Sequence, residues 1–235
     1  MPAERFFLEQ DLLKGARINL EGAELHHLSV MRMKSGDGLE LVNGRGVLAK
    51  AIVETIDKKK SCLLIQDVKI SQTPKNEVIL AQAIPRLNRL DYIVEKGTEL
   101  GMTQLWLFPG HLSERKALTP QQKERVRSLS IAAMKQSGRL FLPKMSEMPV
   151  LEKWAIPDCT TYFGDVEPAA PLLDAVWKDN LKILFFIGPE AGFTSQEIAL
   201  FKKMNAKGVK LSRHVLRTDT AAITALAILE QKLMQ

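Results

Sequence analysis

Cysteine, aromatic residues and long apolar runs are all scarce in this 235-residue chain. Its two cysteines, Cys62 and Cys159, lie far apart in the sequence, which is compatible with two reduced thiols and offers no metal-site spacing. No window approaches the roughly 18 continuous apolar residues of a membrane span, and the N-terminus has no basic segment followed by an apolar one. We therefore expect a cytoplasmic protein without a membrane segment or a metal site.

Several well-known catalytic and nucleotide-binding motifs are also missing. The chain has no G-x-x-x-x-G-K-[ST] phosphate loop, no G-x-G-x-x-G opening a βαβ unit, no G-x-S-x-G elbow and no H-E-x-x-H pair. His26 and His27 do not suggest a metal site, because adjacent helix positions point about 100° apart and no second ligand follows four residues later. Any ligand site must therefore use a different arrangement.

Positive charge is concentrated in one window. The formal net charge is +6, and residues 113–144 carry eight basic side chains against Glu114 and Glu124, so this window accounts for the whole excess. Such clustering is typical of a surface that binds a polyanion, because each phosphate contact releases counterions. A solvated helix face is the alternative that charge alone leaves open.

Residues 1–72 are predicted to form a small, barrel-like β domain. Five short runs have β character, and the turn sequences SGDG and NGRG separate neighbouring runs as hairpin turns do. Between them, Ala23–Met31 is predicted to be helical, with Leu25 and Leu28 on one face. The predicted strands are Arg5–Leu8, Ala16–Leu20, Leu39–Val42, Val47–Ile56 and Ser61–Ile70.

The polar segment Ser71–Glu77 contains proline and lacks apolar periodicity, so it is the predicted boundary of a second domain over residues 73–235. Strands and helices then alternate, which is typical of an α/β domain with a parallel sheet. The predicted strands are Val78–Ile84, Gln104–Phe108, Thr160–Phe163, Ile183–Ile187 and Gly208–Leu211. The predicted helices are Leu87–Leu100, Ala169–Trp177, Thr220–Met234 and two opened by capping boxes, Thr119–Ser137 and Thr194–Met204.

Two loops at the ends of predicted strands form the candidate site. One follows Ile183–Ile187 and reads GPEAG, and the other leads into the final helix through LRTDT. In open α/β sheets such loops lie outside the carboxyl ends of the strands, where ligands usually bind. Gly188 and Gly192 allow the first loop to present main-chain N–H and C=O groups to a ligand. A tight turn before a helix, without a ligand, is the alternative for this motif alone.

Five motifs occur in order along both predicted domains. HLSVMR at 27–32 with GDG at 36–38 is similar to H-L-x-x-V-L-R…G-D, and EKGTELG at 95–101 to K-x-T-E-L-G. QSGR at 136–139 matches Q-S-G-R, GPEAGF at 188–193 is similar to G-P-E-G-G-F, and residues 211–221 to L-G-x-R-I-L-R-x-E-T-A. Together these motifs resemble the RsmE family of 16S ribosomal RNA uridine-N3 methyltransferases, within the SPOUT superfamily.

The chain departs from that family pattern at four positions of the candidate site. Ala191 replaces the second glycine of G-P-E-G-G-F, Ser212 replaces a glycine, and His214 replaces an arginine. Asp219 stands where the family has glutamate, which keeps a carboxylate but shortens its reach. Since main-chain contacts survive side-chain exchange, these departures bear on substrate geometry more than on the cofactor.

The resemblance implies a PUA-like β-barrel that binds RNA, followed by a SPOUT-type α/β domain with a deep trefoil knot that binds S-adenosylmethionine. It implies methylation of N3 of a uridine in 16S rRNA of the small ribosomal subunit, by a homodimer whose cofactor pockets lie near the subunit interface. General folding rules disfavour knots, so the knot rests on the resemblance alone. Two alternatives stay open: a non-catalytic RNA-binding or ribosome-assembly factor, and a SPOUT methyltransferase acting on another RNA base or ribose.

The resemblance and the chemistry of the two loops predict three sets of site residues. Arg217 is predicted to stabilise negative charge on the uracil oxygens, and either Glu190 or Asp219 to accept the N3 proton. The predicted cofactor residues are Gly164, Gly188, Glu190, Gly192, Leu211, Leu216 and Thr218. The predicted RNA contacts are Arg5, Arg32, Arg115, Lys116, Arg127 and Arg139.

Overall fold

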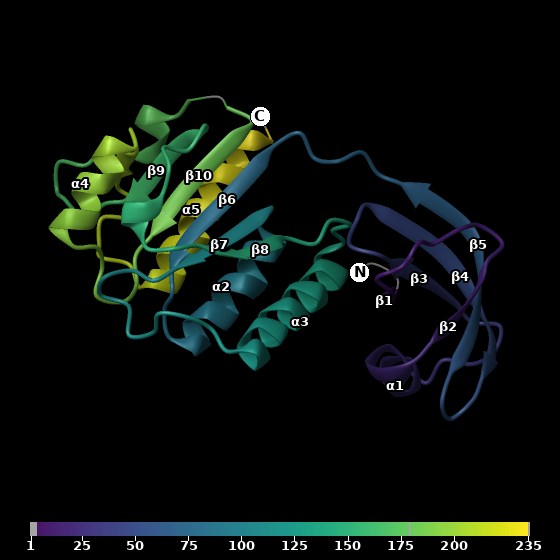
Figure 1. The fold of residues 1–235 in the computed structure, drawn as a ribbon. Coiled ribbons are helices and arrows are strands. Elements are labelled where there is room, and N and C mark those ends of the chain that lie inside the picture. Colours follow the sequence, from purple (N-terminus) through teal and green to yellow (C-terminus); the bar gives the residue numbers. More distant parts are fainter. Residues whose placement is uncertain (1–3, 179, 235) are drawn as a thin grey trace. The chain divides into compact units, whose positions relative to one another are not determined.

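The computed structural model describes residues 4–178 and 180–234, and within them the chain forms two compact units (Figure 1). One unit takes in the chain up to Thr73 together with Ile131–Leu142, and the other takes in Pro74–Ser130 and the chain from Pro143 onward. The break between Thr73 and Pro74 falls in the polar segment that precedes the first strand of the second unit. The functional limits 1–72 and 73–235 stay a prediction.

The first unit is built on a curled five-stranded sheet, with helix α1 (Gly22–Val30) packed against it. Strand β1 pairs with β3 in parallel, and the remaining neighbours pair antiparallel. The β4–β5 ladder shifts register twice, and such irregularities bend a sheet. In spatial order the strands are β1 (Arg5–Phe7), β3 (Gly38–Val42), β4 (Val47–Ile56), β5 (Ser61–Ile70) and β2 (Arg17–Leu20).

Alternation of apolar and polar side chains explains why this sheet curls around a core. In β4 the side chains of Ala49, Ala51 and Val53 are buried while their neighbours are more exposed, and Leu63 and Ile65 of β5 join the same cluster. Helix α1 covers this cluster with Leu28. The five strands predicted for this region are confirmed to within one residue at each end.

A segment from the middle of the chain, Ile131–Leu142, completes the first unit. Arg45 and Phe141 form an antiparallel bridge, and the backbone N–H of Leu142 donates to the carbonyl of Gly44 at 2.9 Å. Gly46 has φ +90°, and a side chain there would collide with the ring of Phe141. The sequence does not predict this exchange, because the contacts join residues about a hundred positions apart.

The second unit is built on a six-stranded, wholly parallel sheet. Ile183–Ile187 are all buried, because helices cover both faces of the sheet and leave no side for polar alternation. The confirmed α/β class follows from this arrangement. In spatial order the strands are β11 (Lys207–Val209), β9 (Thr160–Gly164), β10 (Lys182–Ile187), β6 (Glu77–Ala83), β7 (Gln104–Phe108) and β8 (Lys144–Glu147).

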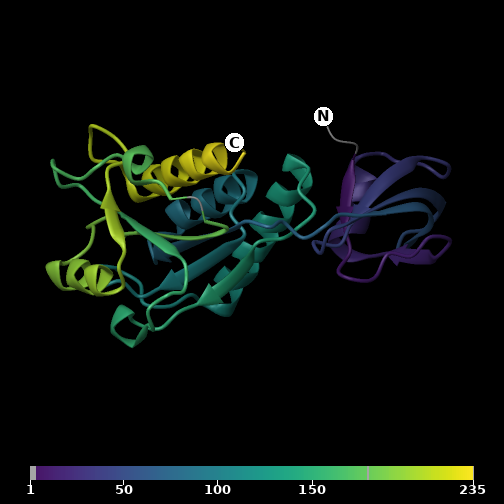
Figure 2. The ribbon, with the colours of Figure 1, turned by 90° about the horizontal axis from the view of Figure 1, so that it is seen from above.

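Helices α2 and α5 pack together on one face of this sheet, and α4 lies on the opposite face (Figure 2). Helix α3 begins in the second unit, and its last turns belong to the first unit. The capping boxes predicted at Thr119 and Thr194 are both present. The helices are α2 (Leu87–Glu99), α3 (Pro120–Ser137), α4 (Ser195–Lys203) and α5 (Thr218–Leu233), with short 3-10 turns η1 (Leu151–Lys153) and η2 (Leu173–Val176).

The chain changes faces after β11. Beside β9, the backbone N–H of Lys210 donates to the carbonyl of Pro171 at 2.8 Å, and Leu172 forms a parallel bridge with Lys210. The chain then leaves the face that carries α4 and enters α5 on the face that carries α2. This crossing begins next to the β9–β10 connection, which contains Pro171 and Leu172.

The structure corrects two expectations about local structure. The helix predicted over Ala169–Trp177 is wrong, because Pro171 and Leu172 bind Lys210 in an extended arrangement and leave room for η2 alone. The strand predicted over Gly208–Leu211 ends at Val209 for the same reason. Strand β8 was missed, because the short sequence KMSE has no apolar alternation.

Candidate functional site

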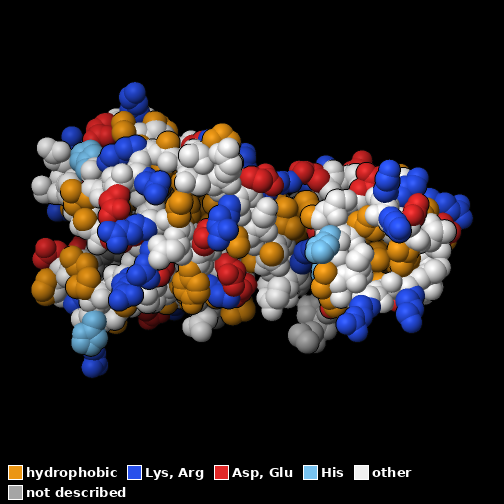
Figure 3. Space-filling view, turned by 90° about the horizontal axis from the view of Figure 1, so that it is seen from below, with side chains coloured by type: hydrophobic (Ala, Val, Ile, Leu, Met, Phe, Trp, Pro, Cys, Tyr) orange, Lys and Arg blue, Asp and Glu red, His pale blue; other side chains and the backbone are white. Residues whose placement is uncertain are grey.

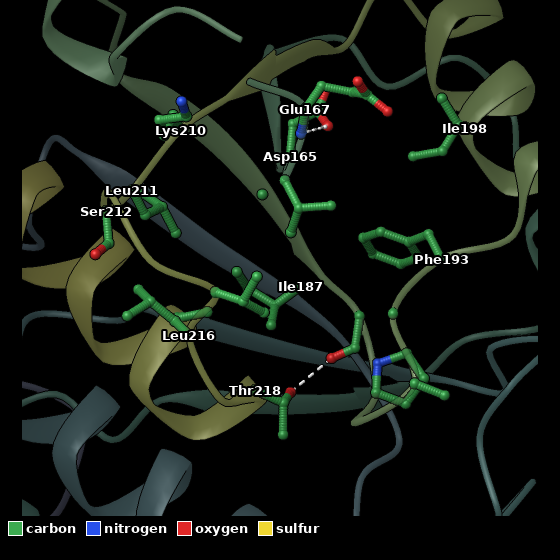
Figure 4. Close-up of a pocket in the computed structure, with 18 of the residues that line it drawn as sticks. Asp165, Glu167, Ile187, Phe193, Ile198, Lys210, Leu211, Ser212, Leu216 and Thr218 are labelled. Atoms are coloured by element: carbon green, nitrogen blue, oxygen red, sulfur yellow. Dashed lines mark hydrogen bonds between the residues drawn. The ribbon is translucent and has the colours of Figure 1, made fainter. Parts of the chain in front are cut away.

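A cavity of about 980 Å³ opens at the carboxyl ends of β9, β10 and β11 (Figure 4). The loops that follow these strands line it together with the first turns of α4 and α5. Ile187, Phe193 and Leu216 contribute apolar walls, and Asp165 and Glu167 add carboxylates. A lining of this kind suits a ligand with both apolar and charged parts.

The loop 188–193 builds one side of the cavity from its main chain. Gly192 has φ +76°, and its backbone N–H donates to the carbonyl of Pro189 at 2.9 Å. A Cβ on Gly188 would lie 3.2 Å from the backbone of Gly192, so the loop closes on itself too tightly for a side chain there. Ala191 is exposed, which explains why this chain tolerates alanine where the family pattern has glycine.

A buried glutamine holds this loop from behind. Gln82 on β6 is fully buried, and its Nε2 donates to the carbonyl of Gly188 at 3.1 Å and to Oγ1 of Thr218 at 3.0 Å. The hydroxyl of Thr218 in turn donates to the same carbonyl at 2.6 Å (Figure 4). We did not predict a role for Gln82 from the sequence. A glutamine inside the apolar strand EVILAQA is nevertheless a signal, because a buried amide needs hydrogen-bond partners.

Glu190 links the loop to the start of α2. Its Oε1 accepts a hydrogen bond from the backbone N–H of Arg86 at 3.0 Å. The guanidinium of Arg86 is paired with Glu114, whose hydrogen bond raises the pKa of Arg86, while the guanidinium lowers the pKa of Glu114. The backbone that follows β6 therefore anchors Glu190 at this side of the cavity, while the exposed ion pair lies outside the lining.

The start of α4 is fixed by a buried carboxylate. Glu197 is fully buried; its Oε2 accepts from the backbone N–H of Thr194 at 2.8 Å, and its Oε1 accepts from the backbone N–H of His111 at 3.0 Å. Oγ1 of Thr194 accepts from the backbone N–H of Glu197 at 3.2 Å, which closes the capping box. Glu197 thus ties the loop after β7 to the end of the loop 188–193.

All seven predicted cofactor residues line the cavity. The predicted catalytic residues differ among themselves. Glu190 lines the cavity, whereas Arg217 is exposed at the position before α5 and lies outside the lining. Asp219 is buried and pairs with Nη1 of Arg89 at 2.7 Å, and its Oδ1 has no hydrogen-bond partner among the described residues. The catalytic roles stay predictions.

The predicted RNA contacts in the first unit differ in exposure. The side chain of Arg5 is 11% exposed and its Nε donates to Glu40 at 2.8 Å. Arg32 is exposed and has φ +54°, an uncommon conformation for a residue other than glycine. Arg139, which lies in the segment Ile131–Leu142 of this unit, is half-buried. Arg32 is therefore the most accessible of the three.

The predicted RNA contacts in the second unit are also unequal. Arg115 is exposed and Arg127 is half-buried, whereas Nζ of Lys116 donates to the carbonyls of Gly110 and His111. On the face of this unit drawn in Figure 3, basic side chains lie next to acidic ones. Much of the basic window is therefore engaged in local pairs, and its RNA-binding role stays a prediction.

The fold and the site have known counterparts. The family described as RNA methyltransferase domain matches residues 71–230, and the RNA methyltransferase PUA domain matches residues 20–66. Ribosomal RNA small subunit methyltransferase E of Synechocystis is 30% identical to this chain, with 96% of this chain and 76% of that protein covered. The chain belongs to this family.

One further relative and two solved structures are similar to this chain over nearly its whole length. The Bacillus subtilis methyltransferase E is 26% identical over 95% of this chain and 94% of its own length. A Neisseria gonorrhoeae member, solved with S-adenosyl methionine, has a TM-score of 0.89 at 24% identity and shares the fold over 98% of both chains. A putative methyltransferase from Legionella pneumophila, solved with the same cofactor, also has a TM-score of 0.89, at 25% identity over 99% of this chain and 98% of that one.

Two further features are absent from the described residues. No helix in this part of the chain is long and apolar enough to cross a membrane. No group of three or more histidine, cysteine, aspartate or glutamate side chains is arranged there to hold a metal ion.

Proposed function

We propose that this protein uses S-adenosylmethionine to methylate N3 of a uridine in the 16S rRNA of the small ribosomal subunit. Its membership of the methyltransferase E family carries this proposal, supported by the cavity at the strand ends. The substrate comes from the names of the relatives, and the uridine N3 position from the motif resemblance. The protein would act in the cytoplasm, where ribosomal subunits are made, and as a homodimer.

The cavity suits this cofactor. Its apolar walls at Ile187, Phe193 and Leu216 offer a place for an adenine ring, and the carboxylates of Asp165 and Glu167 are suitable acceptors for ribose hydroxyls or an ammonium group. The main chain of the loop 188–193 adds N–H and C=O groups without side-chain bulk. The predicted cofactor residues Gly164, Gly188, Glu190, Gly192, Leu211, Leu216 and Thr218 would hold it. When bound, the cofactor supplies an electrophilic methyl group.

The protein must then orient the uracil and remove its weakly acidic N3 proton. Holding the two reactants in line contributes much of the rate. Glu190 is the predicted base that already lines the cavity, whereas Asp219 would need to act while its other oxygen is paired with Arg89. Arg217, exposed at the position before α5, would stabilise the negative charge that develops on the uracil oxygens.

The target uridine must be unstacked, because N3 takes part in base pairing within a regular helix. Arginine and lysine side chains would hold the surrounding phosphates and position the RNA. Arg5, Arg32, Arg115, Lys116, Arg127 and Arg139 are the proposed contacts. Of these, Arg32 and Arg115 are the exposed arginines.

Mass-spectrometric mapping of modified nucleosides tests the proposed reaction. The protein is incubated with S-adenosylmethionine and small ribosomal subunits that lack the modification, and 3-methyluridine is expected in the rRNA. Another methylated nucleoside would assign the enzyme to a different base or ribose. Calorimetry with the cofactor covers the remaining case, since RNA binding without cofactor binding would identify an assembly factor.

Substitutions separate the proposed catalytic roles. Arg217→Ala is expected to lower the methylation rate by about 10²–10³-fold with the cofactor Kd unchanged, as for the loss of one oxyanion donor. Glu190→Gln and Asp219→Asn then compare the two candidate bases, since loss of a general base lowers the rate by about 10²–10⁴-fold. Full activity of Arg217→Ala would exclude its role.

A further inference from the structure

An arginine that the motif resemblance does not single out lies beside the cavity. Arg86 precedes α2, and its backbone N–H donates to Oε1 of Glu190, which lines the cavity. Its side chain is 62% exposed. The backbone of Arg86 is thus fixed to the loop 188–193, while its guanidinium faces solvent.

The guanidinium is held by an acidic side chain in a phosphate-like geometry. Nε of Arg86 donates to both carboxylate oxygens of Glu114, at 3.1 and 3.3 Å, and Nη2 donates to Oε1 at 2.5 Å. Oε1 therefore accepts from both nitrogens and is the main partner of the guanidinium. Arginine also binds phosphate oxygens through these nitrogens, so Oε1 of Glu114 occupies a place that a phosphodiester oxygen would take.

The charges around Glu114 are those of an anion site. Glu114 and Glu124 are the acidic residues of the window 113–144, whose other charged side chains are basic. The neighbouring Arg115 is exposed and, after Arg86, helps to lower the pKa of Glu114. Two arginines thus act on one exposed carboxylate, and both stay in place for another anion when that carboxylate moves away.

The pair contributes little to the fold. Both side chains are more than three-fifths exposed, and exposed ion pairs add little to stability. Glu114 also lies in the connection between β7 and α3, where residues 109–119 form neither helix nor strand. By contrast, Arg125 and Asp91 join two helices, α3 and α2. The partner of Arg86 can move away without unfolding a regular element.

We infer that Arg86 binds a phosphodiester group of the RNA substrate at the rim of the cavity, and that Glu114 fills this site until RNA displaces it. The inference deepens the proposed function and rests on it for the identity of the substrate. Arg115 supplies the second cation of the site. The phosphate would hold the nucleotide next to the loop that Glu190 anchors.

Equilibrium RNA binding by four variants tests this inference. Arg86→Ala removes the cation, Glu114→Gln removes the competing charge, and the double variant asks whether Glu114 acts through Arg86. Asp91→Asn is the matched control, because it removes one negative charge from a similar pair on α2. Binding of 16S rRNA transcripts and of bulk tRNA is measured over a salt series, alongside cofactor binding by calorimetry.

Displacement predicts a specific pattern. Arg86→Ala weakens RNA binding by about fivefold and reduces the salt slope by about 1, as for the loss of one phosphate contact. Glu114→Gln strengthens binding by about threefold in the presence of Arg86, and the double variant binds no better than Arg86→Ala. Asp91→Asn leaves RNA affinity within about twofold, and all variants keep the cofactor Kd.

Three results would overturn the inference. If Glu114→Gln and Asp91→Asn strengthened RNA binding equally, the effect would come from net charge and not from the Arg86 site. The same would hold if Glu114→Gln strengthened RNA binding fully in the absence of Arg86. Unchanged RNA binding by Arg86→Ala would show that Arg86 does not contact the RNA. Failure of the proposed function is seen separately, because wild-type protein would then produce no 3-methyluridine in rRNA while its RNA binding still reports on Arg86.

Discussion

The two loops that face each other across the cavity are constructed differently. The loop 188–193 is held by buried groups: Gln82 and Thr218 bind its first carbonyl, Arg86 binds Glu190, and Glu197 fixes its last turn. Its own shape comes from glycine. Little of it is free to change, so its main chain is organised before any ligand arrives.

The loop 210–217 has fewer attachments. Lys210 is held through Pro168 and Pro171, and Oγ of Ser212 accepts from the backbone N–H of His214 at 3.2 Å. Val215 is 81% exposed. This loop offers side chains rather than main chain to the cavity, and Ser212 and His214 both depart there from the family pattern.

The difference explains where substitution is tolerated. Ala191, which departs from the family pattern in the loop 188–193, is exposed, so its side chain does not disturb the turn. Asp219 departs at a buried position, but its shorter side chain still reaches Arg89 at 2.7 Å. We therefore expect changes behind the loop 188–193 to affect folding and cofactor binding together, and changes at exposed positions of the loop 210–217, such as Val215, to affect substrate use alone.

Gln82→Met should have the largest effect. The substitution keeps the volume of the side chain but removes the amide, so buried oxygens at Gly188 and Thr218 lose a donor. We expect a loss of about 1–3 kcal/mol in the free energy of unfolding, measured with urea, and weaker cofactor binding. Gln104→Met on β7, where the glutamine is half-buried, is the control. Unchanged cofactor affinity would refute the link between Gln82 and the loop.

Gly188→Ala should come next. Its Cβ would lie 3.2 Å from the backbone of Gly192, and relieving such overpacking costs about 1–3 kcal/mol. Gly164→Ala, across the cavity, is the matched control, because its Cβ would meet Ile187 and Leu211 at 3.5 and 3.8 Å, which is ordinary contact. Thermal unfolding should distinguish them. Equal stability of the two variants would show that the first loop is less constrained than its geometry indicates.

Gly192→Ala isolates the conformational part of this constraint. No atom lies within 4 Å of the added Cβ, so the change acts through φ +76° alone. An L-residue in this region costs about 1–2 kcal/mol. Urea unfolding of this variant beside Ala191→Gly, its neighbour without such a demand, measures the difference. A stable Gly192→Ala would mean that the turn relaxes without cost.

Val215→Ser should have the smallest effect. The side chain is mostly in solvent, and surface substitutions of this kind change the free energy of unfolding by less than about 0.5 kcal/mol. Cofactor affinity should also stay the same, whereas the KM for RNA is free to change. A large loss of stability would contradict the contrast between the two loops.

Local patterns were enough to predict most elements of the fold. Capping boxes marked the starts of α3 and α4, hairpin turns and alternation marked the strands of the first unit, and the apolar run before Gly188 marked β10. Prediction failed over residues 169–177, where Lys210 determines the conformation from outside the segment. No local signal reports a partner about forty positions away.

The candidate site divides in the same way. The glycine motif pointed to the loop 188–193 and the resemblance to the residues that line the cavity with it. The sequence predicted neither the role of Gln82 nor the hydrogen bond between Glu197 and His111, because both depend on acceptors and donors brought from other strands and loops. The pairing of Arg86 with Glu114, 28 positions later, was equally hidden.

The sequence by itself determined the class of fold, the order of the elements and the family, because periodicity, turn chemistry and ordered motifs are local properties of the chain. Tertiary structure alone decided that Ile131–Leu142 joins the first unit and that Arg217 stays outside the cavity lining. It also decided which buried groups hold Gly188 and which charge faces Arg86. These depend on hydrogen bonds and ion pairs between distant residues, which form only when the sheet brings their strands together.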